Sequence, residues 1–153
     1  MIINGLQKLT LLDFPGRTAC TVFLGGCNFR CPFCHNASLV LRPASLPRIA
    51  PHELFSFLEK RRGLLDGVAV TGGEPTLQKD LPELLERIKE LGFAVKLDTN
   101  GSDPAMLRRI IDGGLADYAA MDIKSSPEGY AAAVGLPDID LGPVFESADL
   151  LME

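Results

Sequence analysis

The chain has 153 residues, 46% of them hydrophobic, and a formal net charge of -5 at pH 7. This is enough apolar material for one domain over residues 1–153, and no shift in composition marks a second. The negative net charge provides no general attraction for the phosphate backbone of a nucleic acid. No apolar run approaches the ~20 residues that span a bilayer, and the first residues lack the charged-then-apolar order of a signal peptide. We therefore expect a cytoplasmic protein without nucleic acid or membrane partners.

The first expected strand covers residues 18–24, which are apolar and β-branched and precede two glycines. Three of the four cysteines follow within eight positions, as Cys27, Cys31 and Cys34. Disulfides are rare in a reducing cytoplasm, so this cluster indicates metal or redox chemistry. Cys20 lies inside the strand and is expected to be a buried thiol rather than a further ligand.

Helices and strands alternate along the rest of the chain. Pro51 and Pro104 occupy positions where the first turn of a helix tolerates proline, and Asp80 with Glu83 forms a capping-box pattern. Apolar residues recur at helical spacing after each of these three helix starts. The short apolar run over 67–71 lacks polar alternation, which is typical of a buried parallel strand. After a loop over residues 39–49, we expect helices that open at positions 51, 80, 103, 126 and 142, and strands over 67–71, 93–97 and 118–123.

Such alternation implies right-handed βα units, and hence a doubly wound parallel sheet or a complete or partial (β/α) barrel. These architectures bind ligands at the carboxyl ends of their strands. The polar clusters of the sequence follow such ends: residues 27–35, residues 71–74, residues 98–100, and Asp122 with Lys124. One face of the molecule is therefore expected to carry the chemistry.

Three thiolates in one short loop are the soft ligands that iron-sulfur clusters prefer. A cubane held by three cysteines leaves one iron open, whereas a cluster that only transfers electrons normally has four protein ligands. Cys27, Cys31, Phe33 and Cys34 match the pattern Cys-x-x-x-Cys-x-aromatic-Cys, so the chain resembles the radical S-adenosylmethionine (SAM) superfamily. The resemblance implies a 4Fe-4S cluster that binds SAM and cleaves it to a deoxyadenosyl radical. That radical abstracts hydrogen itself, so no side chain is expected to be catalytic.

Gly72, Gly73 and Glu74 follow the second expected strand and resemble the Gly-Gly-Glu motif of the same family. The resemblance implies that they bind the methionine part of SAM. Glycine allows a close approach of the backbone to a ligand, and an acidic group balances an ammonium. The ordinary alternative is a tight turn in which Glu74 only caps a helix.

Further segments resemble the activating proteins of glycyl radical enzymes: His35 with Asn36, residues 98–101 and residues 121–124. Residues 5–16 look closest to the activators of anaerobic ribonucleoside-triphosphate reductase. The resemblance implies that Asp98, Asn100 and Lys124 lie beside SAM, and that Asp98, Thr99 and Asp122 hold a monovalent cation, which hard oxygen ligands suit. It also implies a glycyl radical enzyme as partner, above all anaerobic ribonucleotide reductase, and a flavodoxin-like or ferredoxin-like electron donor.

The family fold has about six βα units, whereas this sequence supplies four clear strands. We therefore expect a partial (β/α) barrel of the radical SAM type, truncated after about four βα units. The fourth strand would then present an unpaired edge, which a homodimer could cover.

Two other functions fit the same residues. A radical SAM enzyme could act on a small molecule or a peptide instead of a partner protein. The cysteines, with His35 beside them, could also hold zinc in an interaction domain without catalysis. His35 itself could donate a hydrogen bond to a cluster sulfur or simply be a solvated loop residue.

Overall fold

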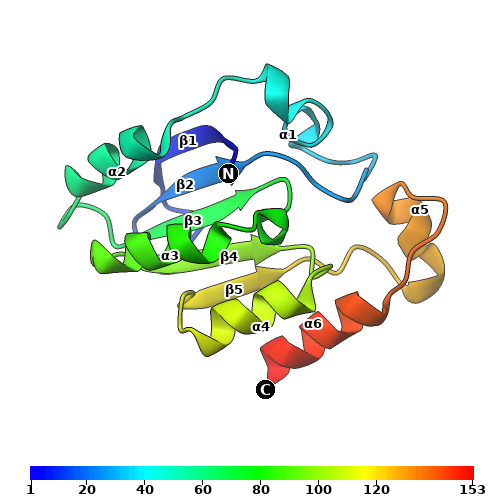
Figure 1. Ribbon diagram of the computed structural model, residues 1–153. Helices are drawn as coiled ribbons and strands as arrows, with labels where there is room; N and C mark the ends of the chain where they lie inside the picture. The colour runs from blue at the N-terminus through cyan, green and yellow to red at the C-terminus, as the bar shows by residue number, and fades with distance from the viewer.

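The computed structural model of the protein describes all residues, 1–153. Its centre is a five-stranded sheet with the order β1-β2-β3-β4-β5. Strand β1 pairs with β2 antiparallel, and the other strands run parallel, so the carboxyl ends of β2 to β5 point the same way (Figure 1). The strands are β1 (Ile3–Thr10), β2 (Ala19–Leu24), β3 (Gly67–Gly72), β4 (Ala94–Thr99) and β5 (Tyr118–Met121).

Helices cover one face of this sheet (Figure 1). The α-helices are α1 (Ala37–Leu41), α2 (Pro51–Glu59), α3 (Leu81–Glu90), α4 (Pro104–Asp112), α5 (Tyr130–Val134) and α6 (Gly142–Met152), and short 3-10 helices span Pro43–Ser45, Pro75–Leu77 and Pro127–Gly129. Alternate strand residues, such as Val22, Val70 and Leu97, pack against the apolar stripes of α2, α3 and α4. The main hydrophobic core therefore lies between the sheet and these helices.

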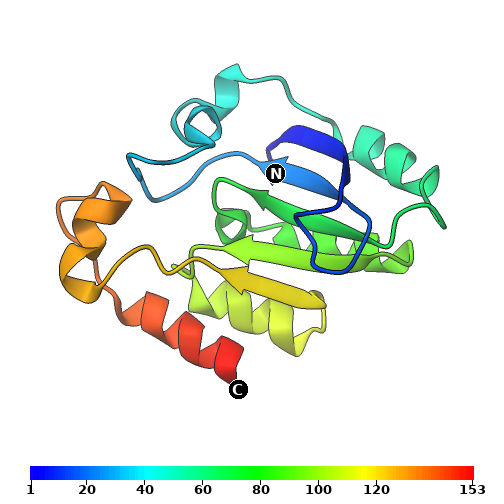
Figure 2. The same ribbon diagram turned by 180° about the vertical axis from the view of Figure 1, so that it is seen from behind.

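The opposite face of the sheet carries no helix (Figure 2). The connection between β1 and β2 places Phe14 on this face, where its ring lies 6.2 Å from that of Tyr118. A Cβ atom on Gly67 would lie 2.8 Å from the Phe14 ring, so glycine is needed there. Gly67 is the first residue of β3. Phe14 therefore covers the amino-terminal end of the parallel strands, opposite the polar loops at their carboxyl ends.

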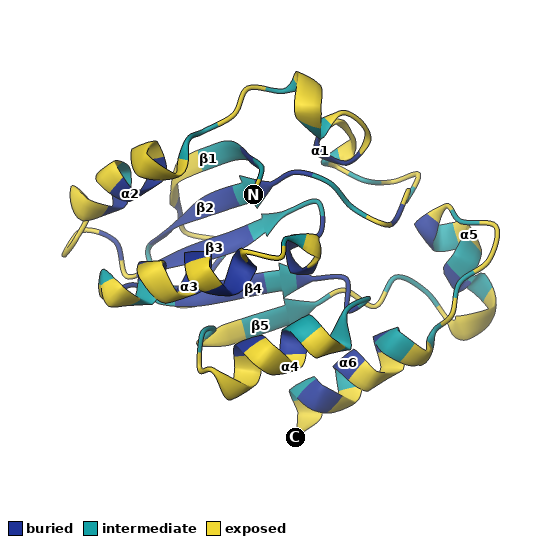
Figure 3. Ribbon diagram, viewed as in Figure 1, coloured by how far each residue is buried: buried dark blue, intermediate teal, exposed yellow.

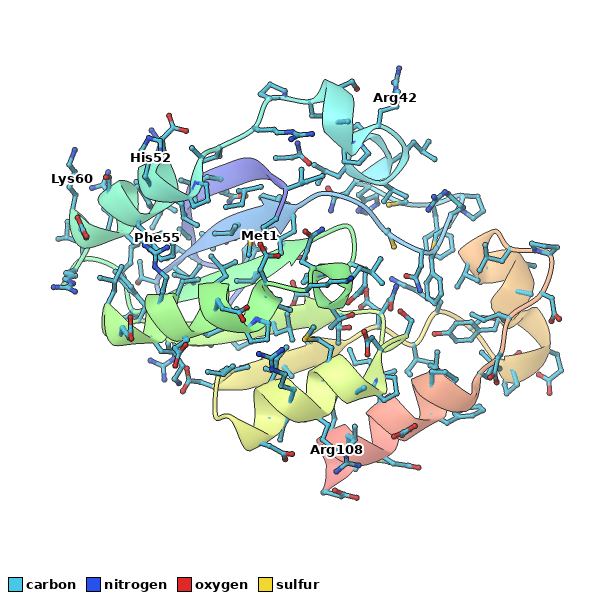
Figure 4. All side chains as sticks on the ribbon, viewed as in Figure 1. Met1, Arg42, His52, Phe55, Lys60 and Arg108 are labelled. Carbon is cyan, nitrogen blue, oxygen red and sulfur yellow. The ribbon has the colours of Figure 1, made fainter.

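Burial follows the layers. In Figure 3 the central strands are dark blue, while β5 at the sheet edge is partly exposed. The polar side chains labelled in Figure 4, Arg42, His52, Lys60 and Arg108, extend away from the sheet and are exposed. None of the helices combines the length and the apolar character that crossing a lipid bilayer requires.

The expected parallel βα architecture is confirmed, but several local details differ. β1 was not expected, because its antiparallel pairing with β2 is a contact between distant residues rather than a local pattern. The expected loop over 39–49 includes the end of α1 and a 3-10 turn. β4 extends to Asp98 and Thr99, and β5 ends at Met121.

The capping box expected at Asp80 does not form. Its side chain makes no capping hydrogen bond to α3 and instead accepts one from the Met1 ammonium at 2.9 Å. The Asp80 backbone has φ −95° and ψ 17°, which is not the extended conformation that a capping residue normally adopts. The fourth cysteine behaves as expected: Cys20 is fully buried, and burial raises the pKa of its thiol to about 12.

Candidate functional site

A cavity of about 340 Å³ opens at the carboxyl ends of the parallel strands. It brings together the polar clusters that the sequence placed after four different strands. Its lining includes Cys27, Cys31, Phe33, Cys34, His35, Gly72, Gly73, Glu74, Asp98, Thr99, Asn100, Asp122 and Lys124. The prediction that these polar segments lie together at one face of the molecule is therefore confirmed.

The loop that carries Cys27, Cys31 and Cys34 is held in place by contacts within the loop and with α5. Phe29 is buried and meets the Tyr130 ring edge-on, with ring centroids 6.5 Å apart. The Arg30 N–H donates to the Val134 carbonyl at 2.7 Å, and its guanidinium donates to the Cys27 and Phe29 carbonyls. The contacts of Phe29 with Tyr130 and of Arg30 with Val134 could not be predicted from local sequence, because each joins residues about a hundred positions apart.

The glycine pair of residues 72 and 73 fits against the start of this loop. The Gly73 N–H donates to the Leu24 carbonyl and the Glu74 N–H to the Gly26 carbonyl, both at 2.8 Å. Gly72 has φ +125°, and a Cβ on Gly72 would overlap the Leu24 backbone, while one on Gly73 would overlap the Gly26 carbonyl. These positions therefore require glycine because two protein segments approach closely there, and the contact of the glycines with a ligand stays a prediction.

Glu74 is 1% exposed and is held by four hydrogen bonds. Its Oε1 accepts from the Thr76 N–H, the Thr76 hydroxyl and the Thr99 hydroxyl, and its Oε2 accepts from the Asn100 N–H at 2.7 Å. Burial raises the pKa of Glu74, and these hydrogen bonds oppose the rise. The carboxylate is therefore fixed in the pocket wall, with its position set by β4 as well as by its own loop.

Two lysine-aspartate pairs lie near the cavity, one on β4 and one directly after β5. The Lys96 ammonium pairs with Asp98 on β4, and the Lys124 ammonium donates to Asp122 at 2.7 Å after β5. Burial by itself would lower the pKa of Lys124, but the Asp122 carboxylate raises it overall. Lys96 is buried and was missed by the sequence analysis, because a lysine inside an apolar strand gives no sign of its partner.

His35 lines the cavity, but its imidazole makes no hydrogen bond in the structure. The hydrogen bonds that reach a cysteine sulfur come from the Phe29 N–H and the Asn100 amide, both to Cys27. His35 thus donates to no cysteine sulfur here, and its donation to a cluster sulfur stays a prediction. Asn36 instead holds the glycine segment, because its amide donates to the Gly72 carbonyl at 3.2 Å.

The three cysteine thiols are half-buried and share one wall of the cavity. Burial is the main cause that raises the pKa of Cys27, so a positive group is needed to hold its thiolate. No three His, Cys, Asp or Glu side chains in the structure are arranged to hold one metal ion. The thiolates of a cubane bind different irons and need not meet at one point, so this donor set fits a 4Fe-4S cluster.

Fold and site together define an α/β protein with a sulfur-lined cofactor cavity at the carboxyl ends of a partial barrel. Residues 21–153 match the radical SAM superfamily, and the chain belongs to this family. Membership implies a 4Fe-4S cluster and SAM as the family's cofactors. The solved structure of QueE from Escherichia coli has the same fold, with a TM-score of 0.53, 23% identity, and coverage of 66% of this chain and 53% of that one.

The curated relatives of the chain carry names of two kinds, protein-activating enzymes and enzymes named for a small-molecule product. The chain is 36% identical, over 130 residues, to a Methanocaldococcus jannaschii protein named as a glycyl-radical enzyme activating enzyme, covering 84% of this chain and 52% of that protein. It is 32% identical, over 132 residues, to the 7-carboxy-7-deazaguanine synthase of Thermococcus kodakarensis, covering 71% of this chain and 50% of that enzyme. The chain thus spans about half the length of the curated relatives it matches.

Proposed function

We propose that residues 1–153 form a radical SAM domain in which Cys27, Cys31 and Cys34 hold the 4Fe-4S cluster. The observation that carries this proposal is the placement of three half-buried thiols and the Gly72–Glu74 segment around one cavity. When bound, the cluster supplies the electron that cleaves SAM. Membership of the family counts against the alternative of a zinc-binding interaction domain.

The side chains would bind and orient SAM rather than transfer protons. Glu74 is the proposed partner of the methionine ammonium, because its carboxylate is fixed by four hydrogen bonds and needs no reordering when a cation arrives. Lys124 is the proposed partner of the methionine carboxylate, with Asp98 nearby on β4. The buried position of Glu74 also limits competition from water.

We propose further that the protein installs a glycyl radical on a partner enzyme, in particular anaerobic ribonucleotide reductase. The similarity to the Methanocaldococcus jannaschii protein supports this class of partner. A flavodoxin-like or ferredoxin-like donor would supply the electron, and a second copy could cover the edge of β5. The competing activity is on a small molecule, which the similarity to 7-carboxy-7-deazaguanine synthase favours.

The activity on a partner protein and the activity on a small molecule can be distinguished by which molecule loses a hydrogen atom to the deoxyadenosyl radical. Anaerobically reconstituted protein is mixed with dithionite, SAM and a candidate glycyl radical enzyme, and 5′-deoxyadenosine and the electron paramagnetic resonance spectrum are measured. We expect 5′-deoxyadenosine together with a glycyl radical doublet on the partner, and no doublet when the target glycine is replaced by alanine. 5′-Deoxyadenosine that rises only with a deazapurine-like small molecule would support the competing activity instead.

The monovalent cation expected beside Asp98, Thr99 and Asp122 stays a prediction. Asp98 already pairs with Lys96, Asp122 pairs with Lys124, and the Thr99 hydroxyl donates to Glu74. These contacts favour an arrangement in which the buried Lys96 supplies the positive charge that a cation would otherwise bring.

The cation prediction is tested by titrating reconstituted protein with SAM in potassium chloride and in choline chloride at equal ionic strength. If Lys96 supplies the charge, the dissociation constants agree within about twofold, and Lys96→Met creates a preference for potassium of about tenfold. A wild-type protein that itself binds SAM about tenfold more tightly in potassium would support the cation site.

A further inference from the structure

Asn100, directly after β4, closes a ring of three hydrogen bonds with Asn28 and Ser102. Its amide nitrogen donates to Asn28 Oδ1 at 3.0 Å, the Asn28 amide donates to the Ser102 hydroxyl at 2.9 Å, and the Ser102 N–H donates to Asn100 Oδ1 at 2.9 Å. Asn28 and Asn100 are 72 positions apart in the chain. The ring therefore joins the cysteine loop to the loop after β4.

Asn100 also contacts both groups of residues that are proposed to bind cofactors. Its backbone N–H donates to Glu74 Oε2 at 2.7 Å, and its amide nitrogen lies 3.8 Å from Cys27 Sγ. The Phe29 N–H is a second donor to this sulfur, at 3.3 Å. Cys27 thus receives hydrogen bonds from two donors, whereas the sulfurs of Cys31 and Cys34 receive none in the structure.

The resemblance to known activators placed Asn100 beside SAM, but its side chain already has partners within the protein. The amide group has two hydrogens, directed at Asn28 and Cys27, and its oxygen accepts from Ser102. The residue is also only 6% exposed. A buried amide whose hydrogens and oxygen are all paired with protein groups holds those groups in place.

We infer that Asn100 is a positioning residue for the iron-sulfur cluster, and that its ring with Asn28 and Ser102 fixes the Cys27 ligand relative to Glu74. The inference rests on the proposed 4Fe-4S function. A hydrogen bond to a ligand sulfur stabilises the more negative, reduced cluster and so raises its reduction potential.

The test compares Asn100→Ala, Asn28→Ala and the double variant after anaerobic reconstitution. We expect Asn100→Ala to speed bleaching of the cluster by a chelator about tenfold and to lower the midpoint potential. Because the two residues share one hydrogen bond, the double variant should bleach no faster than Asn100→Ala alone. Asn4→Ala is the matched control: the Asn4 amide donates only to the Pro43 and Pro47 carbonyls, and Asn4 lies outside the cavity lining, so the potential should stay at the wild-type value.

A second measurement needs no cluster. In the metal-free protein, hydrogen exchange of the amides in residues 27–31 should be about tenfold faster in Asn100→Ala than in wild type, with α3 unchanged. Unchanged exchange in this loop, or a potential and a bleaching rate equal to those of wild type, would overturn the inference. A wild-type protein that takes up no iron would overturn the proposed function, while the exchange experiment would still decide whether Asn100 holds the loop.

Discussion

Replacing Cys27, Cys31 or Cys34 by serine is expected to abolish cluster assembly and, with it, the cleavage of SAM. Each thiol is half-buried at the wall of the same cavity, and the serine hydroxyl is a much harder and weaker ligand for iron than a thiolate. With only two thiolates left, iron content should fall to background, and 5′-deoxyadenosine formation should drop by about 100-fold or more. Iron and sulfide analysis and product chromatography measure these two effects.

Cys20→Ala is the matched control, since Cys20 is the one cysteine that lies outside the cavity lining and is fully buried in β2. We expect wild-type iron content and a loss of about 1 kcal/mol in the free energy of unfolding. If the serine variants kept their iron, the assignment of the three ligands would fail. If Cys20→Ala lost its iron, Cys20 would have to be counted among the ligands.

Gly73→Ala is expected to cause a large loss of stability. The added Cβ would overlap the Gly26 carbonyl, and this overlap is with backbone, so no side-chain rotation relieves it. The clash would separate β3 from the start of the cysteine loop and break the hydrogen bonds that Gly73 and Glu74 donate to Leu24 and Gly26. We expect a loss of ~3 kcal/mol, or a fall in Tm of about 10 °C, together with low cluster occupancy.

Gly92→Ala provides the control for Gly73→Ala. Gly92 has φ +90°, but a Cβ there would meet no atom within 4 Å, so alanine costs only backbone strain. We expect about 1 kcal/mol from thermal denaturation and full cluster occupancy. Equal stability losses in the two variants, or normal iron content in Gly73→Ala, would show that the contact between the glycine segment and the cysteine loop is not what positions the site.

The structure explains why two motifs from separate parts of the sequence form one site. Gly72 and Gly73 let β3 approach the end of β2 closely, and Glu74 is then anchored by Thr99 and Asn100 at the end of β4. The pocket is thus assembled by contacts between the ends of three adjacent strands. Substitutions in any of these strand ends are expected to affect the other two, because the hydrogen bonds are shared.

The sequence by itself determined the features that depend on local order. The period of apolar residues predicts α2, α3 and α4 and the parallel strands, since a side chain's face follows directly from the helical or strand repeat. The spacing of Cys27, Cys31 and Cys34 indicates iron-sulfur chemistry, because one short loop must present all three sulfurs. The meeting of the polar segments at one face follows from parallel strand order.

Only the tertiary structure decided the contacts between distant residues. No periodic signal in the sequence indicates these contacts. They are the pairing of β1 with β2, the packing of Phe14 against Gly67, the Lys96 to Asp98 pair and the hydrogen-bonded ring around Asn100. The position of the Asn100 amide between Asn28 and Cys27 is likewise not indicated by the residues around it in the sequence. The physical reason is that a polar side chain's role depends on which donors and acceptors the folded chain brings within hydrogen-bonding distance, and sequence neighbours do not specify these.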